Sequence, residues 1–225
     1  MKTDRLRIGW ICILGCLSLT SALGQNRNTP QVRFKDGVYL TLQQLQTNQP
    51  GYSWKQLRGN WFRNPESGVV TVVELIAAEN AALSPESLWG VCVDGKPAVR
   101  IDADSINRSS VVFYPLTITG AISYFSYEGI LRDTVEMAAF NPESGLPFRK
   151  GKVQRSRQEP RERLLLWQTG EILPFTRENL LRWTDNDPEI RRAISVLQEG
   201  EPNFREQLLR AIVVYNQRNP LPVVK

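Results

Sequence analysis

Residues 88–101, LWGVCVDGKPAVRI, hold the pattern that decides the fold. Asp94-Gly95 suits a two-residue type I′ turn, which requires positive φ at both positions and matches the twist of two paired strands. With these two residues as the loop, apolar side chains alternate between the faces of a β-hairpin: Trp89, Val91 and Ala98 on one, and Cys92, Val99 and Ile101 on the other. Pro97 cannot donate to a strand ladder, so the second strand is expected at a sheet edge or a bulge.

Strand-forming residues dominate the chain around this hairpin, and helical patterns follow them. β-branched and aromatic residues, which favour strands, recur in residues 38–40, 69–76, 111–127, 164–167 and 171–173. Thr176, Asp187 and Pro202 are then each expected to begin a helix. The last helix is expected over residues 202–218, docked on the body through an apolar stripe of Phe204, Leu208 and Ile212.

Strands followed by helices predict an α+β fold, with mostly antiparallel strands and hairpins in residues 36–175 and a helical C-terminal segment packed on the sheet. The predicted parts are a signal peptide, a flexible mature N-terminus, a β-rich body, and a helical segment of the same domain. Their bounds are residues 1–24, 25–34, 35–175 and 176–220.

The N-terminus has the features of a secretory signal peptide. Basic residues precede an apolar stretch from Ile8 to Leu19, and small residues precede Gln25, so cleavage is expected after Gly24. The apolar stretch is shorter than the roughly 20 residues needed to span a bilayer. The mature chain is therefore expected to have no transmembrane span. Cys16 leaves a second interpretation open, in which it is the lipidated residue of a lipoprotein.

Composition excludes several classes of enzyme. The chain contains no histidine, so Ser-His-Asp and Cys-His nucleophile systems and imidazole metal sites are excluded. Cys92 is the single cysteine after the leader, and its apolar neighbours favour a buried thiol over a nucleophile. No catalytic, cofactor-binding or metal-binding residue is predicted, and no cofactor is expected.

Positive charge is concentrated in residues 149–163, RKGKVQRSRQEPRER, which contain seven Lys and Arg against two Glu. Because one segment accounts for the basic character, nucleic acid is not an expected partner. The segment is either a solvated hairpin or connector, or a contact for an anionic envelope component such as lipid head groups. The contact residues in the second interpretation are Arg149, Lys150, Lys152, Arg155 and Arg157. In an extended segment, Lys150 and Lys152 would face away from Arg155, so the charge would not be confined to one face.

Two function classes follow from these observations. The first is a non-enzymatic envelope protein that acts by binding a partner protein or an envelope component. The second is a carboxylate-based hydrolase or a glycan-binding module, which needs two facing acids or exposed tryptophans. The tryptophans to consider are Trp54, Trp61, Trp89, Trp167 and Trp183.

Four motifs together resemble a group of uncharacterised exported proteins of Gram-negative Bacteroidota. They are DGVYLTLQQLQTNQP, LWGVCVDGKPAVRI, TGEILPFTRENL and YNQRNP, and the similarity covers most of residues 35–220. These are motifs of turns and caps, and no activity is attached to the group. The resemblance implies export and a shared fold, and it assigns no site residue. No sorting domain follows Pro220, so the expected location is the periplasm or the inner face of the outer membrane.

Overall fold

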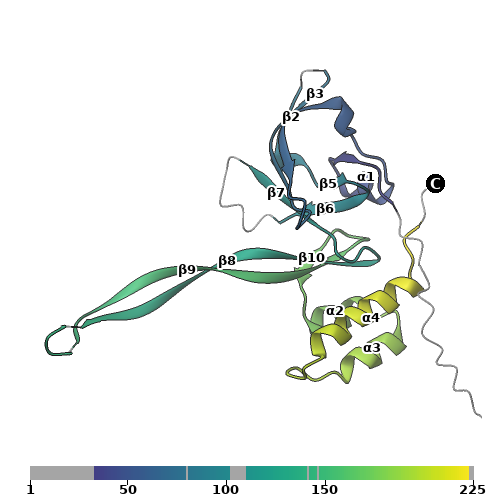
Figure 1. Ribbon diagram of the computed structural model, residues 1–225. Coiled ribbons are helices and arrows are strands. Elements are labelled where there is room, and N and C mark those ends of the chain that lie inside the picture. Colours follow the sequence, from purple (N-terminus) through teal and green to yellow (C-terminus); the bar gives the residue numbers. More distant parts are fainter. Residues whose placement is uncertain (1–32, 80, 102–109, 141, 146, 223–225) are drawn as a thin grey trace, which may run out of the picture. The chain divides into compact units, whose positions relative to one another are not determined.

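A computed structural model describes residues 33–79, 81–101, 110–140, 142–145 and 147–222 (Figure 1). The backbone alone is described at residues 139 and 147–149. The described chain belongs to one compact unit, residues 32–225. The predicted signal peptide, including Cys16, and nearly all of the predicted flexible N-terminus lie outside the described residues.

The first half of the unit is an antiparallel sheet in the order β1-β5-β6-β7-β3-β2, with β4 paired to β3. Its strands are β1 (Gly37–Tyr39), β2 (Leu57–Arg63), β3 (Val70–Ala77), β4 (Ala82–Leu83), β5 (Gly90–Val93), β6 (Lys96–Arg100) and β7 (Val111–Pro115). A short helix α1 (Leu42–Gln46) follows β1, and two 3₁₀ turns lie at Trp54–Gln56 and Pro85–Ser87.

The hairpin predicted in residues 88–101 is formed by β5 and β6. Asp94 and Gly95 have φ values of 56° and 75°, as a type I′ turn requires. Val91 and Ala98 lie in one core cluster, whereas Cys92 and Val99 lie in another. The prediction for Trp89 is wrong: it precedes β5, where strand alternation does not apply, and it packs with the Cys92 cluster.

The expectation that Pro97 marks a sheet edge or a bulge is also wrong. Strand β6 lies between β5 and β7, and Cys92 pairs with Pro97 in a regular register. Proline is tolerated there because β7 ends at Pro115, which pairs with Ala98. Pro97 lies beyond this last pair, so its missing N–H removes no hydrogen bond between β6 and β7. The Pro97 carbonyl still accepts a hydrogen bond of 2.9 Å from the Leu116 N–H.

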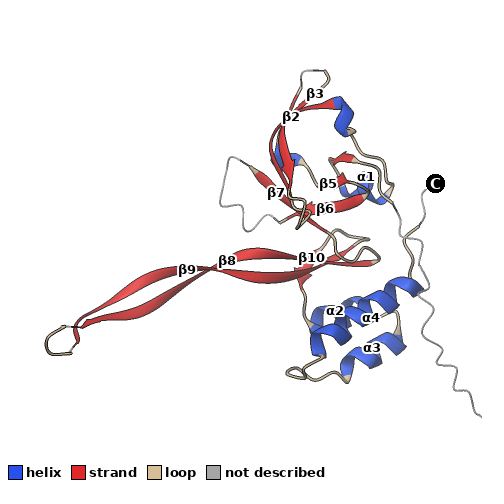
Figure 2. Ribbon diagram, viewed as in Figure 1, coloured by secondary structure: helices blue, strands red, loops and turns tan. Residues whose placement is uncertain are grey.

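A second sheet has the order β10-β9-β8. It is dominated by a hairpin of two unusually long strands, β8 (Ile122–Phe140) and β9 (Pro147–Leu166), and β10 (Ile172–Pro174) pairs with the start of this hairpin (Figure 2). The two long strands pair continuously, from Ile122 opposite Leu166 to Phe140 opposite Pro147, with one shift after Ala139. The whole basic segment, residues 149–163, therefore belongs to β9.

Three helices follow. The starts of the first two agree with the sequence, whereas the last begins two residues after the predicted Pro202. They are α2 (Arg177–Trp183), α3 (Pro188–Ser195) and α4 (Phe204–Arg218). The Thr176 hydroxyl caps α2, and the Asp187 carboxylate caps α3. In α4, Leu208 and Ile212 are buried as predicted, whereas Phe204 at its first turn is only half-buried. None of the described helices is long and apolar enough to cross a bilayer.

The base of the long hairpin is the centre of the fold. On one face of this base, Phe125 and Leu165 pack into a cluster with residues of the first sheet, including Tyr39 and Cys92. On the other face, residues of β8 and β9 pack against the helices. Alternation along the two strands thus gives each face of the base its own core, and the result is the α+β architecture that the sequence predicts.

Candidate functional site

The candidate site is the part of the long hairpin that lies beyond this core. We call residues 128–140 of β8 and 147–160 of β9 the arm. None of the described side chains in residues 130–140 or 150–158 is buried. A two-stranded ribbon with both faces in solvent is marginally stable by itself. The arm therefore contributes little to the stability of the core, and its surface is available to a partner.

The strand register divides the side chains of the arm between two faces. Directly opposed residues of an antiparallel pair share a face, and so do alternate residues of one strand. Leu131 lies opposite Arg157, Asp133 opposite Arg155, and Val135 opposite Val153. We call this the arginine face; its described members are Leu131, Asp133, Val135, Met137, Val153, Arg155, Arg157 and Glu159. Arg161 and Arg163 continue the same alternation toward the base of the hairpin.

Large apolar side chains are exposed on the arginine face. Val135, Met137 and Val153 have exposed fractions of 39%, 59% and 47%. Val135 and Val153 are directly opposed, and Met137 is two residues along the same strand. Arginines next to exposed apolar residues are typical of protein-binding surfaces.

The opposite face of the arm has a different composition. It carries Lys150 and Lys152 together with Arg132, Glu128 and Glu136, and Glu136 lies directly opposite Lys152. We call this the lysine face. Both faces carry charges of both signs, since Asp133 and Glu159 lie on the arginine face. The faces differ because the exposed large apolar side chains of residues 128–138 and 150–160 all lie on the arginine face.

The five residues proposed from sequence are thus all in β9 and do not form one cluster. Lys150, Lys152, Arg155 and Arg157 are exposed, and of Arg149 only the backbone is described, opposite Ala139. The division of these cations between two faces agrees with the expectation for an extended segment. Sequence reasoning missed that Leu131, Val135 and Met137 of β8 share a face with the arginines of β9. A usable pattern was present, because every arginine of residues 149–163 has an odd number and so belongs to one face.

Where the arm leaves the core, β9 is fixed to α4 by a polar cluster. Arg205 donates to the Glu162 carboxylate over 2.8 Å from Nε and to the Tyr124 hydroxyl over 2.9 Å, and Tyr124 in turn donates to Glu162. Burial, together with the hydrogen bond to Glu162, raises the pKa of Tyr124 to about 12, so the phenol remains protonated. The cluster therefore joins β8, β9 and α4 at the start of the arm.

A second contact of α4 holds the backbone of β8. The buried Asn216 side chain accepts a hydrogen bond of 2.9 Å from the Ile122 N–H and donates one of 2.8 Å to the Ile122 carbonyl. A Cβ atom at Gly120 would lie 2.2 Å from Cγ of Asn216, so glycine is needed there for the close approach. The amide thus takes the place of a neighbouring strand at the beginning of β8.

Asp187 at the start of α3 offers a test by pH. Its pKa is lowered, first by the hydrogen bond from the Ile190 N–H and then by the Arg218 guanidinium. A carboxyl group whose pKa is lowered by folding stabilises the folded state at pH values above its unfolded-state pKa of about 3.9. This stabilisation is lost as the pH falls through the pKa of the folded state. Asp187→Asn keeps a cap but has no carboxyl group to titrate. We therefore expect the stability difference between wild type and Asp187→Asn in urea unfolding to be largest near pH 6 and to shrink steadily as pH falls below about 4. A constant difference across this range would contradict the assignment.

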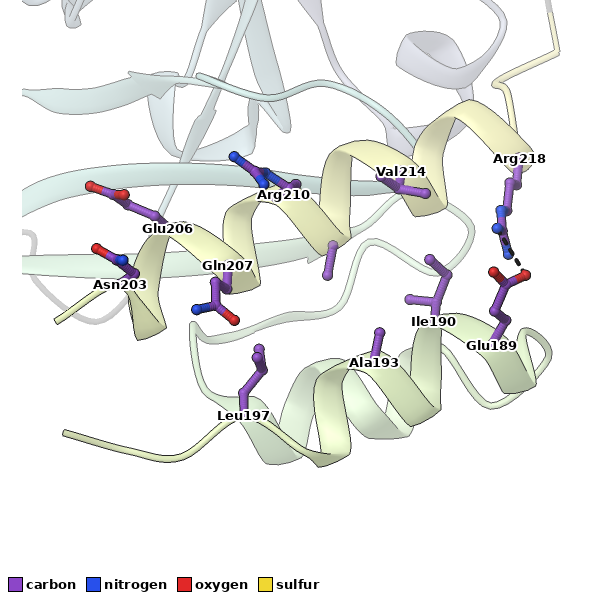
Figure 3. A pocket seen from close by; sticks show the side chains of 11 residues that line it. Glu189, Ile190, Ala193, Leu197, Asn203, Glu206, Gln207, Arg210, Val214 and Arg218 are labelled. Carbon is purple, nitrogen blue, oxygen red and sulfur yellow. Dashed lines mark ion pairs between the residues drawn. The ribbon is translucent and has the colours of Figure 1, made fainter. Parts of the chain in front are cut away.

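A groove of about 470 Å³ lies between α3 and α4 (Figure 3). Ile190, Ala193 and Val214 line it with apolar surface, and Glu189 forms an ion pair of 3.0 Å with Arg218. Its other acid, Glu206, lies at the opposite end of the groove from Glu189 (Figure 3). The two acids do not face each other across a substrate-sized gap, which is the arrangement that glycoside hydrolysis requires.

The tryptophans considered for sugar binding pack against the core. Trp167 and Trp183 are buried, and the other three are half-buried. Trp54 stacks on Trp61 with ring centroids 4.1 Å apart, and its Nε1 donates to the Cys92 carbonyl over 2.7 Å. None of the five is thus a fully exposed side chain.

Cys92 is a buried thiol, as its neighbours in the sequence predicted. Burial and the nearby Asp36 carboxylate raise its pKa, so the thiolate is disfavoured. Within the part of the chain that the structure describes, no group of three Cys, Asp or Glu side chains is placed to hold a metal ion. No protein-family model, curated protein or solved structure matches the chain.

Proposed function

We propose that the protein is a non-enzymatic binding protein of the cell envelope and that its arm holds a partner protein through the arginine face. The observation that supports this proposal is the placement of Arg155 and Arg157 on the same face as exposed Val135, Met137 and Val153. Export to the periplasm or the inner face of the outer membrane is part of the proposal and rests on the predicted leader.

The chemistry of the arginine face favours an acidic protein surface as the partner. Arginine presents a planar fork of donors that matches a carboxylate in two parallel hydrogen bonds. The neighbouring apolar side chains favour a surface that is also partly apolar, and arginine and methionine are enriched in such interfaces. A purely electrostatic attraction to anionic lipid would instead use Lys150 and Lys152 of the lysine face equally well.

Crosslinking at two neighbouring positions tests which face is used. The photoreactive amino acid p-benzoylphenylalanine is placed at Val153 on the arginine face, or at Gln154 on the lysine face, and intact cells are irradiated. We expect position 153 to give a discrete adduct with one other protein and position 154 to give little. Equal adducts from both positions, or none from position 153, would contradict the proposal.

Paired charge removals separate a protein partner from a lipid surface. Arg155→Gln with Arg157→Gln removes two cations from the arginine face, and Lys150→Gln with Lys152→Gln removes two from the lysine face of the same strand. We expect the first pair to reduce the adduct at position 153 by at least tenfold, since the two charge-assisted contacts together contribute roughly 2 kcal/mol or more. The second pair should leave it unchanged. An equal effect of both pairs, with co-sedimentation on anionic liposomes that fades at high salt, would show a lipid surface instead.

A further inference from the structure

We propose that the protein forms a symmetric dimer in which the outer edge of β8 in the arm pairs antiparallel with the same edge of a second copy. Within the described chain, β8 lies at the end of its sheet, and no strand pairs with its outer edge along residues 128–140. An edge of this length presents a row of backbone donors and acceptors that another strand can complete. Pairing of two edges would turn two marginal ribbons into one four-stranded sheet.

The two edges of the arm differ in a way that selects β8. The outer edge of β9 carries Lys150, Lys152 and Pro160, which are the residue types that keep edge strands from pairing. Two β9 edges would also bring cations of one copy close to cations of the other. Residues 128–140 of β8, EGILRDTVEMAAF, contain neither lysine nor proline. The edge of β8 is therefore the unprotected one.

The charges of β8 are complementary to those of β8 in a second copy of the chain, so this strand fits the edge. With a two-fold axis perpendicular to the joined sheet, the arginine faces of both copies lie on the same side of the sheet. Directly opposed residues of the two β8 strands must therefore both be odd-numbered or both even-numbered. In the register centred on Thr134, the middle of residues 128–140, Arg132 lies opposite Glu136 of the second copy. Symmetry repeats this pair, so two opposite-charge pairs form on one face. Opposite charges in directly opposed positions stabilise a strand pair.

The same register also matches apolar residues on the other face. Leu131 lies opposite Met137 of the second copy, and symmetry repeats this contact. The exposed apolar patches of the two arms become continuous, and the arginine faces of both copies lie on the same side of the four-stranded sheet. The inference does not depend on the proposed function, because the strand pairing is made by backbone groups of β8 and does not involve Arg155 or Arg157 of β9.

A disulfide test reports the register directly. Residues 25–225 contain the whole compact unit and have Cys92 as their single, buried cysteine. Thr134→Cys would place two cysteines opposite each other across the axis, with Cα atoms about 4.5–5.5 Å apart, within disulfide range. Gln154→Cys, opposite Thr134 on β9, is the matched control. We expect a disulfide-linked dimer from Thr134→Cys and none from Gln154→Cys under mild oxidation. Equal dimer from both variants would overturn the proposal.

Sedimentation tests the charge pairs without a new cysteine. Wild type is expected to be a dimer at about 100 μM, and Arg132→Glu is expected to weaken it about tenfold, since both pairs become repulsive. Arg157→Glu makes the same change of charge on β9 and should leave the dimer intact. Unchanged melting temperatures would show that the body remains folded in both variants. A monomeric wild type, or a dimer unaffected by Arg132→Glu, would overturn the proposal.

Discussion

Replacing Phe125 with alanine is expected to lower the free energy of unfolding by about 3–5 kcal/mol. Phe125 lies at the base of β8, is fully buried, and packs in the cluster that joins the first sheet to the long hairpin. Truncation would leave a cavity at the point where these two parts meet. Urea unfolding followed by tryptophan fluorescence would measure the loss.

Phe140 is a matched control in the same strand. It is 59% exposed at the far end of β8, and Phe140→Ala is expected to change the free energy of unfolding by less than about 0.5 kcal/mol. Similar losses from the two variants would mean that the arm is part of the cooperative core. Its surface would then be needed for folding, and the argument that it is available to a partner would fail.

Asn216→Ala is expected to lower the free energy of unfolding by about 2–6 kcal/mol. The change removes both hydrogen bonds to Ile122 and leaves a buried N–H and a buried carbonyl without partners, at about 1–3 kcal/mol each. Gln217→Ala, at the next, exposed position of α4, is the control and should have little effect. Thermal and urea unfolding would measure both variants.

Gly120→Ala makes the test of this contact more specific. In wild type the new Cβ would collide with the Asn216 side chain, but in Asn216→Ala that side chain is absent. We therefore expect Gly120→Ala to cost clearly more stability in wild type than in the Asn216→Ala background. Equal costs in the two backgrounds would contradict the contact between α4 and the beginning of β8.

Features specified by neighbouring residues could be predicted from the sequence. The Asp94-Gly95 turn and the Thr176 and Asp187 caps depend on chemistry within a few residues, and each occurs where the sequence indicates. The burial of Leu208 and Ile212 follows from the helical period of the last segment. The position of Pro97 in the sheet could not be predicted, because a proline is accepted in β6 only as a result of where β7 ends. That end is set by residues far from Pro97 in the sequence.

The arm could not be predicted from hydrophobic pattern for a physical reason. A strand with one buried face alternates apolar and polar residues, but residues 128–140 and 149–160 have both faces in solvent and lack this alternation. The strands predicted at residues 111–127 and 164–167 therefore ended where the buried core ends, although β8 and β9 continue beyond it. Half of the candidate site, the arginines of β9, could be listed from composition. The other half, Leu131, Val135 and Met137, depends on the pairing with β8.

In the proposed function, the arm binds a partner while the rest of the chain folds without it. The most direct measurement compares wild type with a variant in which Asn-Gly replaces residues 131–157, so that the hairpin closes between Ile130 and Gln158. We expect the same melting temperature for both proteins. We also expect that the partner identified by crosslinking at position 153 co-purifies with wild type and is absent from the purified shortened variant. A shortened variant that still binds this partner would show that the arm is not the binding site.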